Sequence, residues 1–75
     1  MSETVYVRFK WDNFGYMPGD VVQCRLNERD NKGVHVTMWS PEDKEEINAW
    51  SDLGSFEELT AMEVIAHAAA GTPFL

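Results

Sequence analysis

Cysteine and long apolar segments are almost absent from this chain of 75 residues. The single cysteine, Cys24, excludes an internal disulfide framework and fits a reducing compartment. No apolar run approaches the roughly 20 residues that a membrane-spanning helix needs. The first four residues, Met-Ser-Glu-Thr, show neither the basic nor the apolar region of a signal peptide. We therefore expect a cytoplasmic protein that does not bind membranes.

Basic residues are also scarce. Six Lys and Arg stand against 13 Asp and Glu, which gives a formal net charge of −7 and a pI near 4.5. Because binding to double-stranded DNA relies on Lys and Arg, this balance argues against duplex DNA as the main ligand. An acidic chain is better suited to a macromolecule with a basic surface.

Sequence motifs for chemistry are missing as well. The chain has no glycine-rich dinucleotide or phosphate-binding loop. Cys24 has no second cysteine, His35 and His67 lie on different predicted elements, and the pair Glu63 and His67 alone would make a poor metal site. Nucleophilic catalysis would need a positioned base and an orienting third group. We expect no catalytic residues, metal, cofactor or small-molecule substrate, and hence no enzymatic activity.

What the chain does contain is divided unevenly along its length. Five of the nine aromatic residues lie between residues 6 and 16, whereas all of the net charge comes from residues 42–63. This division predicts a neutral, aromatic front and an acidic back that are presented to different environments.

Alternating apolar and polar residues predict three strands, at about 4–11, 20–26 and 34–39. In the first, Val5, Val7, Phe9 and Trp11 would point to the core. A Pro-Gly pair at residues 18 and 19 predicts a type II turn before the second strand. Strands so close in sequence favour an antiparallel meander.

Two helices are predicted after the strands. Ser40 and Pro41, followed by acidic residues, resemble a capped helix start, which predicts a helix at about 41–51. Ser55 with Glu58 resembles a capping box, which predicts a second, mostly buried helix at about 56–70. The expected fold is α+β: one small domain, residues 1–75, with a three-stranded antiparallel sheet followed by two C-terminal helices.

Two surfaces are candidates for binding. The first is the acidic helical half, whose carboxylates could occupy a basic groove, although helix capping and solubility would also explain many of them: Glu42, Glu45, Glu46, Asp52, Glu57 and Glu58. The alternative is the outward face of the sheet, where aromatic and basic side chains alternate and could stack single-stranded bases: Tyr6, Arg8, Lys10, Arg25 and Trp39. An ordinary polar sheet face is the competing interpretation of this second set.

The segment Gly15-Tyr16-Met17-Pro18-Gly19-Asp20-Val21-Val22 resembles the G-Y-x-P-G-D-V-V turn of many very small bacteriophage-encoded proteins. The preceding segment at residues 5–9 and the helix end at residues 66–72 are similar to theirs too. The resemblance implies a non-enzymatic regulator in the cytoplasm of a host bacterium. It would bind RNA polymerase, as the small transcription inhibitors and antiterminators of phages do.

An inhibitor of a nuclease complex, of the anti-CRISPR type, is the alternative that size and acidity leave open. A core this small also favours stabilisation by a partner or by a second copy of the chain, as a homodimer.

Overall fold

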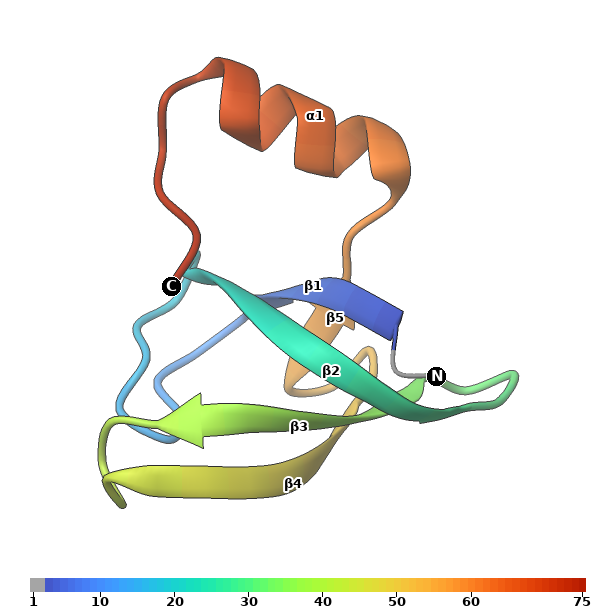
Figure 1. The fold of residues 1–75 in the computed structure, drawn as a ribbon, viewed down its shortest axis with the longest axis vertical. Coiled ribbons are helices and arrows are strands. Elements are labelled where there is room, and N and C mark those ends of the chain that lie inside the picture. Colours follow the sequence, from blue (N-terminus) through green and yellow to red (C-terminus); the bar gives the residue numbers. More distant parts are fainter. Residues whose placement is uncertain (1–2) are drawn as a thin grey trace.

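The structure is a computed structural model that describes residues 3–75. In this part of the chain, an antiparallel sheet of five strands precedes one short helix (Figure 1). The elements are β1 (Glu3–Phe9), β2 (Val21–Arg29), β3 (Val34–Ser40), β4 (Glu45–Ser51), β5 (Phe56–Glu58) and α1 (Ala61–Ala69). The strands lie in the order β4-β3-β2-β1-β5, so the last strand pairs with the first.

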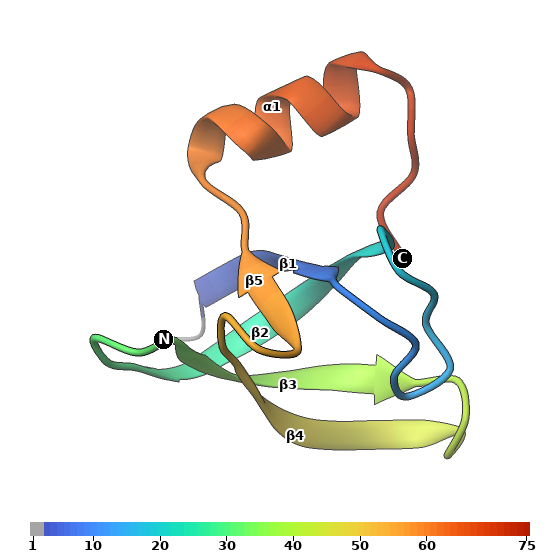
Figure 2. The same ribbon diagram turned by 180° about the vertical axis from the view of Figure 1, so that it is seen from behind.

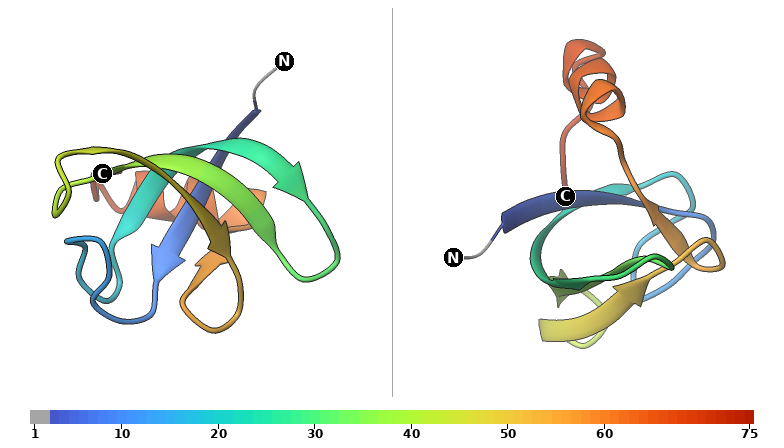
Figure 3. Two further views of the ribbon diagram at one scale, coloured as in Figure 1. Left: turned by 90° about the horizontal axis from the view of Figure 1, so that it is seen from below. Right: turned by 90° about the vertical axis from the view of Figure 1, so that its right-hand side faces the viewer.

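The sheet curls around its own core. Strand β1 pairs with β2 on one side and with β5 on the other, and a register shift between Leu26 and Glu28 marks a bulge in β2 that helps the sheet to bend (Figures 2 and 3). The Ser51 hydroxyl donates to the carbonyl oxygen of Phe56 at 3.4 Å, which ties the end of β4 to the start of β5. The result is a small, nearly closed barrel-like sheet.

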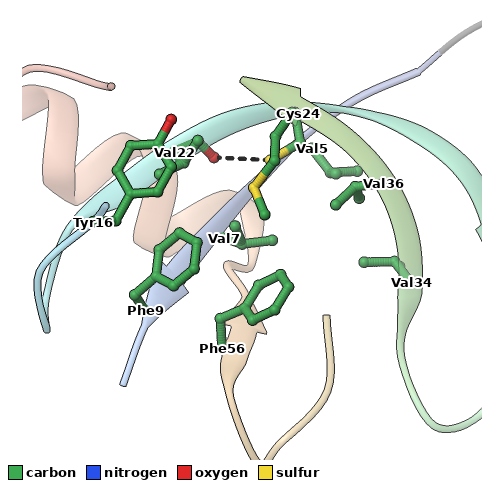
Figure 4. Packing of buried hydrophobic residues seen from close by; sticks show 10 residues of the cluster. Val5, Val7, Phe9, Tyr16, Val22, Cys24, Val34, Val36 and Phe56 are labelled. Carbon is green, nitrogen blue, oxygen red and sulfur yellow. Dashed lines mark hydrogen bonds between the residues drawn. The ribbon is translucent and has the colours of Figure 1, made fainter. Parts of the chain in front are cut away.

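The core fills the inside of this curl. Valines from β1, β2 and β3 line it, and the ring of Phe9 stacks between Tyr16 and Phe56, with centroid separations of 5.0 and 4.9 Å (Figure 4). The buried apolar residues are Val5, Val7, Phe9, Tyr16, Val21, Val22, Cys24, Val34, Val36, Met38, Phe56 and Leu59. The core residues come from the strands, from the segment that contains Tyr16, and from Leu59. The sheet therefore does not depend on a helix to cover its core.

The predicted fold class is wrong: the sheet has five strands rather than three, and one short helix follows it rather than two. The three predicted strands are present as β1, β2 and β3, although β1 ends at Phe9 and leaves Trp11 exposed. The residues that follow β3 and precede α1 form strands where the sequence suggested helical turns.

The helix predicted at 41–51 is a hairpin turn followed by β4. The capping contact exists, because the Ser40 hydroxyl accepts a hydrogen bond from the amide of Asp43 at 3.2 Å. The amide of Lys44 then donates to the Ser40 carbonyl at 2.7 Å, and Lys44 has a φ of 58°, which reverses the chain. Residues 45–51 pair with β3 over seven positions. The predicted capping contact thus belongs to a turn and starts no helix, because pairing with β3 follows immediately.

The helix predicted at 56–70 begins later, at Ala61. Phe56 is buried in the core and opens β5, so the apparent capping box at Ser55 does not start a helix. A capping box is instead formed by Thr60 and Glu63, each side chain bonding to the other residue's amide, at 3.2 and 3.0 Å. Burial of a large aromatic ring outweighed a local helix signal one turn earlier.

Helix α1 stands outside the sheet and contributes no buried residue (Figures 1 and 3). Met62 and Ile65 are 81% and 67% exposed, which contradicts the expectation of a mostly buried helix. Its contacts with the body come from its inner side, where Glu63 reaches Arg8 and the ring of His67 packs on Phe74. No helix in residues 3–75 is long and apolar enough to cross a membrane.

This placement makes a testable prediction about stability. Ile65→Ala is expected to change the free energy of unfolding by no more than about 0.5 kcal/mol, because the side chain is exposed. The matched change Val36→Ala, at a fully buried position, should cost about 1–3 kcal/mol through lost burial and a new cavity. Urea denaturation of both variants measures this difference. A loss for Ile65→Ala equal to that for Val36→Ala would contradict the exposed position of α1.

Candidate partner-binding surface

The six carboxylates predicted to form one helical surface lie on three separate parts of the fold. Glu42 is in the turn between β3 and β4, and Glu45 and Glu46 begin β4. Asp52 lies in the turn before β5, whereas Glu57 and Glu58 belong to β5 itself. The sequence therefore identified acidic positions, but the sheet distributes them over both of its edges.

Ion pairs join the two halves of the sequence that were expected to form separate faces. Each of the three arginines lies beside carboxylates from distant segments. The pairs are Arg8 with Glu57 at 3.2 Å and Glu63 at 3.5 Å, Arg25 with Glu46 at 3.1 Å, and Arg29 with Glu58 at 2.7 Å and Glu3 at 3.4 Å. A neutral front and an acidic back do not exist as separate surfaces, because the arginines of the front neutralise acids of the back.

Asp52 has a structural task in its turn. One of its carboxylate oxygens accepts hydrogen bonds from the amides of Gly54 at 2.8 Å and Ser55 at 2.9 Å. The amide of Ser55, and then that of Gly54, lower the pKa of Asp52 below its usual value, because these hydrogen bonds favour the charged form. This carboxylate therefore has a structural role in the connection between β4 and β5, which explains its presence without a partner.

Glu42 and Glu45 are different, because within residues 3–75 no hydrogen bond or ion pair is made by either side chain. Both are exposed near the β3–β4 turn. The turn is fixed in place: the amide of Glu42 donates to the carbonyl of Phe14 at 3.2 Å, and Gly15, with φ +92°, passes so close that a Cβ atom there would lie 2.8 Å from the Glu42 nitrogen. The turn therefore presents the carboxylates of Glu42 and Glu45, with the ammonium group of Lys44 between them in sequence, close to Phe14 and Gly15.

The predicted basic and aromatic sheet face is also divided. Tyr6 and Arg8 lie under α1 and the C-terminal segment, with the ring of Tyr6 packed on Phe74 at 4.6 Å. The ammonium group of Lys10 donates to the carbonyl of Leu53. Only Arg25 and Trp39 remain together on the uncovered part of the sheet, across β2 and β3.

That uncovered part is the outer side of β2, β3 and β4, which we call the tryptophan face. Strand register places Arg25, Thr37 and Asn48 in one row, His35 beside Trp50, and Trp39 beside Glu46. The face consists of Arg25, Asn27, His35, Thr37, Trp39, Glu46, Asn48 and Trp50. Its two indole side chains are 52% and 44% exposed, for Trp39 and Trp50. Exposed tryptophans on ordered strands are typical of binding surfaces.

Hydrogen bonds hold the polar residues between the two tryptophans in place. The side-chain amide of Asn27 donates a hydrogen bond to the Thr37 hydroxyl at 2.8 Å. That hydroxyl in turn donates to the side-chain oxygen of Asn48 at 2.7 Å. The ring of His35 lies 5.2 Å from that of Trp50. A face whose side chains are already ordered loses less conformational entropy when a partner binds.

Trp39 is also anchored from behind. The hydroxyl of Tyr16 donates to the backbone carbonyl of Trp39 at 2.6 Å. Burial, with smaller contributions from Cys24 and Asp20, raises the pKa of Tyr16, so the hydroxyl stays protonated and available as a donor. Within the aromatic-rich segment at residues 6–16, Tyr16 thus supports Trp39.

Trp50 is the tryptophan of this face that sequence reasoning missed, because it falls within the helix predicted at 41–51. The signal that identifies it is the alternation of residues 46–51. Ile47 and Ala49 pack against the core, whereas Glu46, Asn48 and Trp50 point outward. A period of two in this segment competes with the i, i+3 spacing of Ile47 and Trp50.

Reactive groups are sparse in the described residues. Cys24 is buried, and burial raises the pKa of its thiol to about 12, so it remains protonated at neutral pH. Within residues 3–75, no group of three or more His, Cys, Asp or Glu side chains is arranged to hold a metal ion. An open hollow of about 450 Å³ beside Glu42 is lined by residues 12–17. The Tyr16 hydroxyl, which lines this hollow, already donates to the backbone carbonyl of Trp39.

The chain matches no family model and no curated protein, and no solved structure matches its fold. The geometry of the tryptophan face and of the acidic turn beside it is therefore the basis for assigning a function.

Proposed function

We propose that this chain is a non-enzymatic binding module that recognises a protein with a basic surface through its tryptophan face. The observation that carries the proposal is the pair Trp39 and Trp50, both about half exposed on adjacent strands of one sheet. Tryptophan is strongly enriched among residues that dominate the energy of protein interfaces. Burial of two such rings would supply a large part of the affinity.

Electrostatics supports a basic protein as the partner. The unneutralised carboxylates of Glu42 and Glu45 lie in and just after the turn that connects β3 to β4, at the end of the tryptophan face that carries Trp39. A basic rim on the partner would be attracted to these groups, which raises the association rate and selects against acidic proteins. The net charge of −7 adds a long-range field of the same sign.

RNA polymerase of a host bacterium is the first partner to test. Its selection rests on the resemblance of residues 15–22 to a turn of very small phage-encoded proteins, which implies a regulator of this type, and on the acidic surface, because proteins that handle nucleic acids carry basic channels. A nuclease complex has the same electrostatic character and is the alternative within this class. Either partner would be inhibited or redirected by occupation of a basic surface rather than by chemistry.

A pull-down from bacterial lysate with the tagged full-length chain tests this proposal. We expect a nucleic-acid-handling complex to be captured at moderate salt, and Trp39→Ala and Trp50→Ala each to reduce its capture at least tenfold. Trp11→Ala is the matched control, because Trp11 is equally exposed but lies off the face. The proposal would be refuted if both Trp39→Ala and Trp50→Ala captured the partner as well as the wild type does. It would also be refuted if the captured partner had no basic surface.

Single-stranded nucleic acid is a second candidate, favoured by the stacking surfaces of Trp39, Trp50 and His35 beside Arg25. All three arginines are paired with acids, however, including Arg25 with Glu46, so the one basic side chain of the tryptophan face is already neutralised. Quenching of tryptophan fluorescence by short oligonucleotides at low salt would move the assignment to this candidate.

A further inference from the structure

Strand β4 forms one edge of the sheet and has a neighbour on only one side (Figures 1 and 2). Its seven residues pair with β3 without interruption, from Glu45 opposite Ser40 to Ser51 opposite Val34. Within residues 3–75, the backbone of β4 makes no hydrogen bond beyond β3. A continuous row of amide and carbonyl groups therefore faces away from the sheet, and such groups pair readily with another extended chain.

Several features that commonly protect an edge strand are missing from β4. β4 contains no proline, no lysine and no bulge, and it is longer than the other edge strand, β5, which has three residues. Ile47 and Ala49 are only partly buried on its inner side, so an added strand would also cover apolar surface. The charges on β4 are the carboxylates of Glu45 and Glu46, both at its first end.

We propose that the free edge of β4 accepts an extended basic segment of the partner protein as a sixth strand of the sheet. Backbone hydrogen bonds to the edge would provide the pairing, and Lys or Arg side chains of the segment would meet the acidic first end of β4 and the turn before it. The inference rests on the proposed function, since it specifies how the basic partner engages.

Charge selects this occupant over a second copy of the same chain. Glu42 and Glu45 make no ion pair among the described residues, and Asp43 and Lys44 lie between them, so residues 42–45 keep an excess of negative charge. A second copy would bring its own net charge of −7 to this edge, which opposes association. A basic strand would be attracted by the same groups.

A synthetic peptide with the sequence Thr-Lys-Val-Lys-Val-Lys-Thr, blocked at both ends, is the probe. Hydrogen exchange of the full-length protein is followed by nuclear magnetic resonance with and without the peptide. Amides of residues 45–51 that point away from β3 are expected to exchange at least tenfold more slowly at saturation. The inference would be overturned if the amide exchange rates of β4 stayed unchanged in the presence of 1 mM peptide at low salt.

Three modified peptides separate strand addition from simple charge attraction. The same peptide with Glu in place of Lys should bind at least tenfold more weakly. Two further peptides carry N-methyl groups on alternate residues, so that each is blocked along one of its two edges. Strand addition uses one edge of the peptide, so only one of these two peptides should lose binding. Equal binding of both would contradict an added strand.

A pair of protein variants tests the charge at the edge. Glu45→Lys should weaken binding of the lysine peptide about fivefold. Glu28→Lys makes the same change of net charge on β2, at an exposed position without an ion pair in the described residues, and should have a smaller effect. Equal effects would show that only the overall charge attracts the peptide.

Failure of this inference and failure of the proposed function have different results. If Trp39→Ala abolishes capture of a lysate partner but no peptide protects β4, the tryptophan face binds and the edge does not. If the lysine peptide protects β4 while both tryptophan variants capture the partner normally, the edge is a binding site and the proposed use of the face is wrong.

Discussion

Phe56→Ala is expected to lower the free energy of unfolding by about 3–5 kcal/mol, which is a large share of the stability of a domain this small. The ring is fully buried and stacks on Phe9 at a centroid separation of 4.9 Å. Its loss leaves a cavity where β5 closes onto β1, at the pairing of Phe9 with Phe56. Chemical denaturation followed by circular dichroism measures the change.

Trp11→Ala is the control for this variant. It also removes a large aromatic side chain, but one that is 51% exposed and outside the strands, so we expect a loss below about 1 kcal/mol. If Phe56→Ala were no more destabilising than Trp11→Ala, then residue 56 would not lie in the core, and the pairing of β5 with β1 would be refuted.

Gly33→Ala is expected to destabilise the protein by about 1–3 kcal/mol through overpacking. A Cβ atom at residue 33 would collide with the carbonyl oxygen of Ser51, because Gly33 passes close to the end of β4 just before β3 begins. The Ser51 carbonyl belongs to the backbone and the Cβ atom is fixed to it at residue 33, so the collision is relieved only if the two backbone segments move apart. The first pair of the β3–β4 ladder, Val34 with Ser51, would be affected most.

Gly54→Ala provides the comparison, because a Cβ atom there would meet only the carboxylate of Asp52, at 3.1 Å. A side-chain end gives way more readily than backbone, and we expect a loss below about 1 kcal/mol. Thermal unfolding of both variants distinguishes the two positions. A Gly33→Ala variant as stable as the wild type would show that β4 does not end against this residue.

The edge of the sheet illustrates how local and non-local information compete in this chain. Ser40 was predicted to cap a helix; its hydroxyl instead caps a turn, in which the amide of Lys44 donates one helix-like hydrogen bond to the Ser40 carbonyl. Seven residue pairs with β3 then outweigh the helical alternative. The spacing of Ile47 and Trp50 fits a helix and therefore does not predict this pairing. A partner strand distant in sequence contributes energy that a local window does not contain.

Only part of the tryptophan face was predicted from the sequence, because the rest depends on contacts between distant residues. Arg25 and Trp39 were assigned to an outward sheet face, and they lie there. Trp50 and Asn48 complete that face only because β4 is a strand. Tyr6 and Arg8 do not belong to the uncovered face, because Phe74 packs on Tyr6 and Glu63 of α1 pairs with Arg8. Which outward residues are free thus depends on the elements that cross the sheet.

The sequence by itself determined β1, β2 and β3, the turn at Gly19, and the inward valines of these strands, because alternation and turn residues act over a few neighbouring positions. It also determined the excess of negative charge. The tertiary structure alone decided that residues 45–51 and 56–58 are strands, that arginines neutralise acids from distant segments, and that α1 lies outside the core. These outcomes depend on contacts between residues far apart in the chain, where burial of Phe56 and pairing with β3 and β1 outweigh local helix preference.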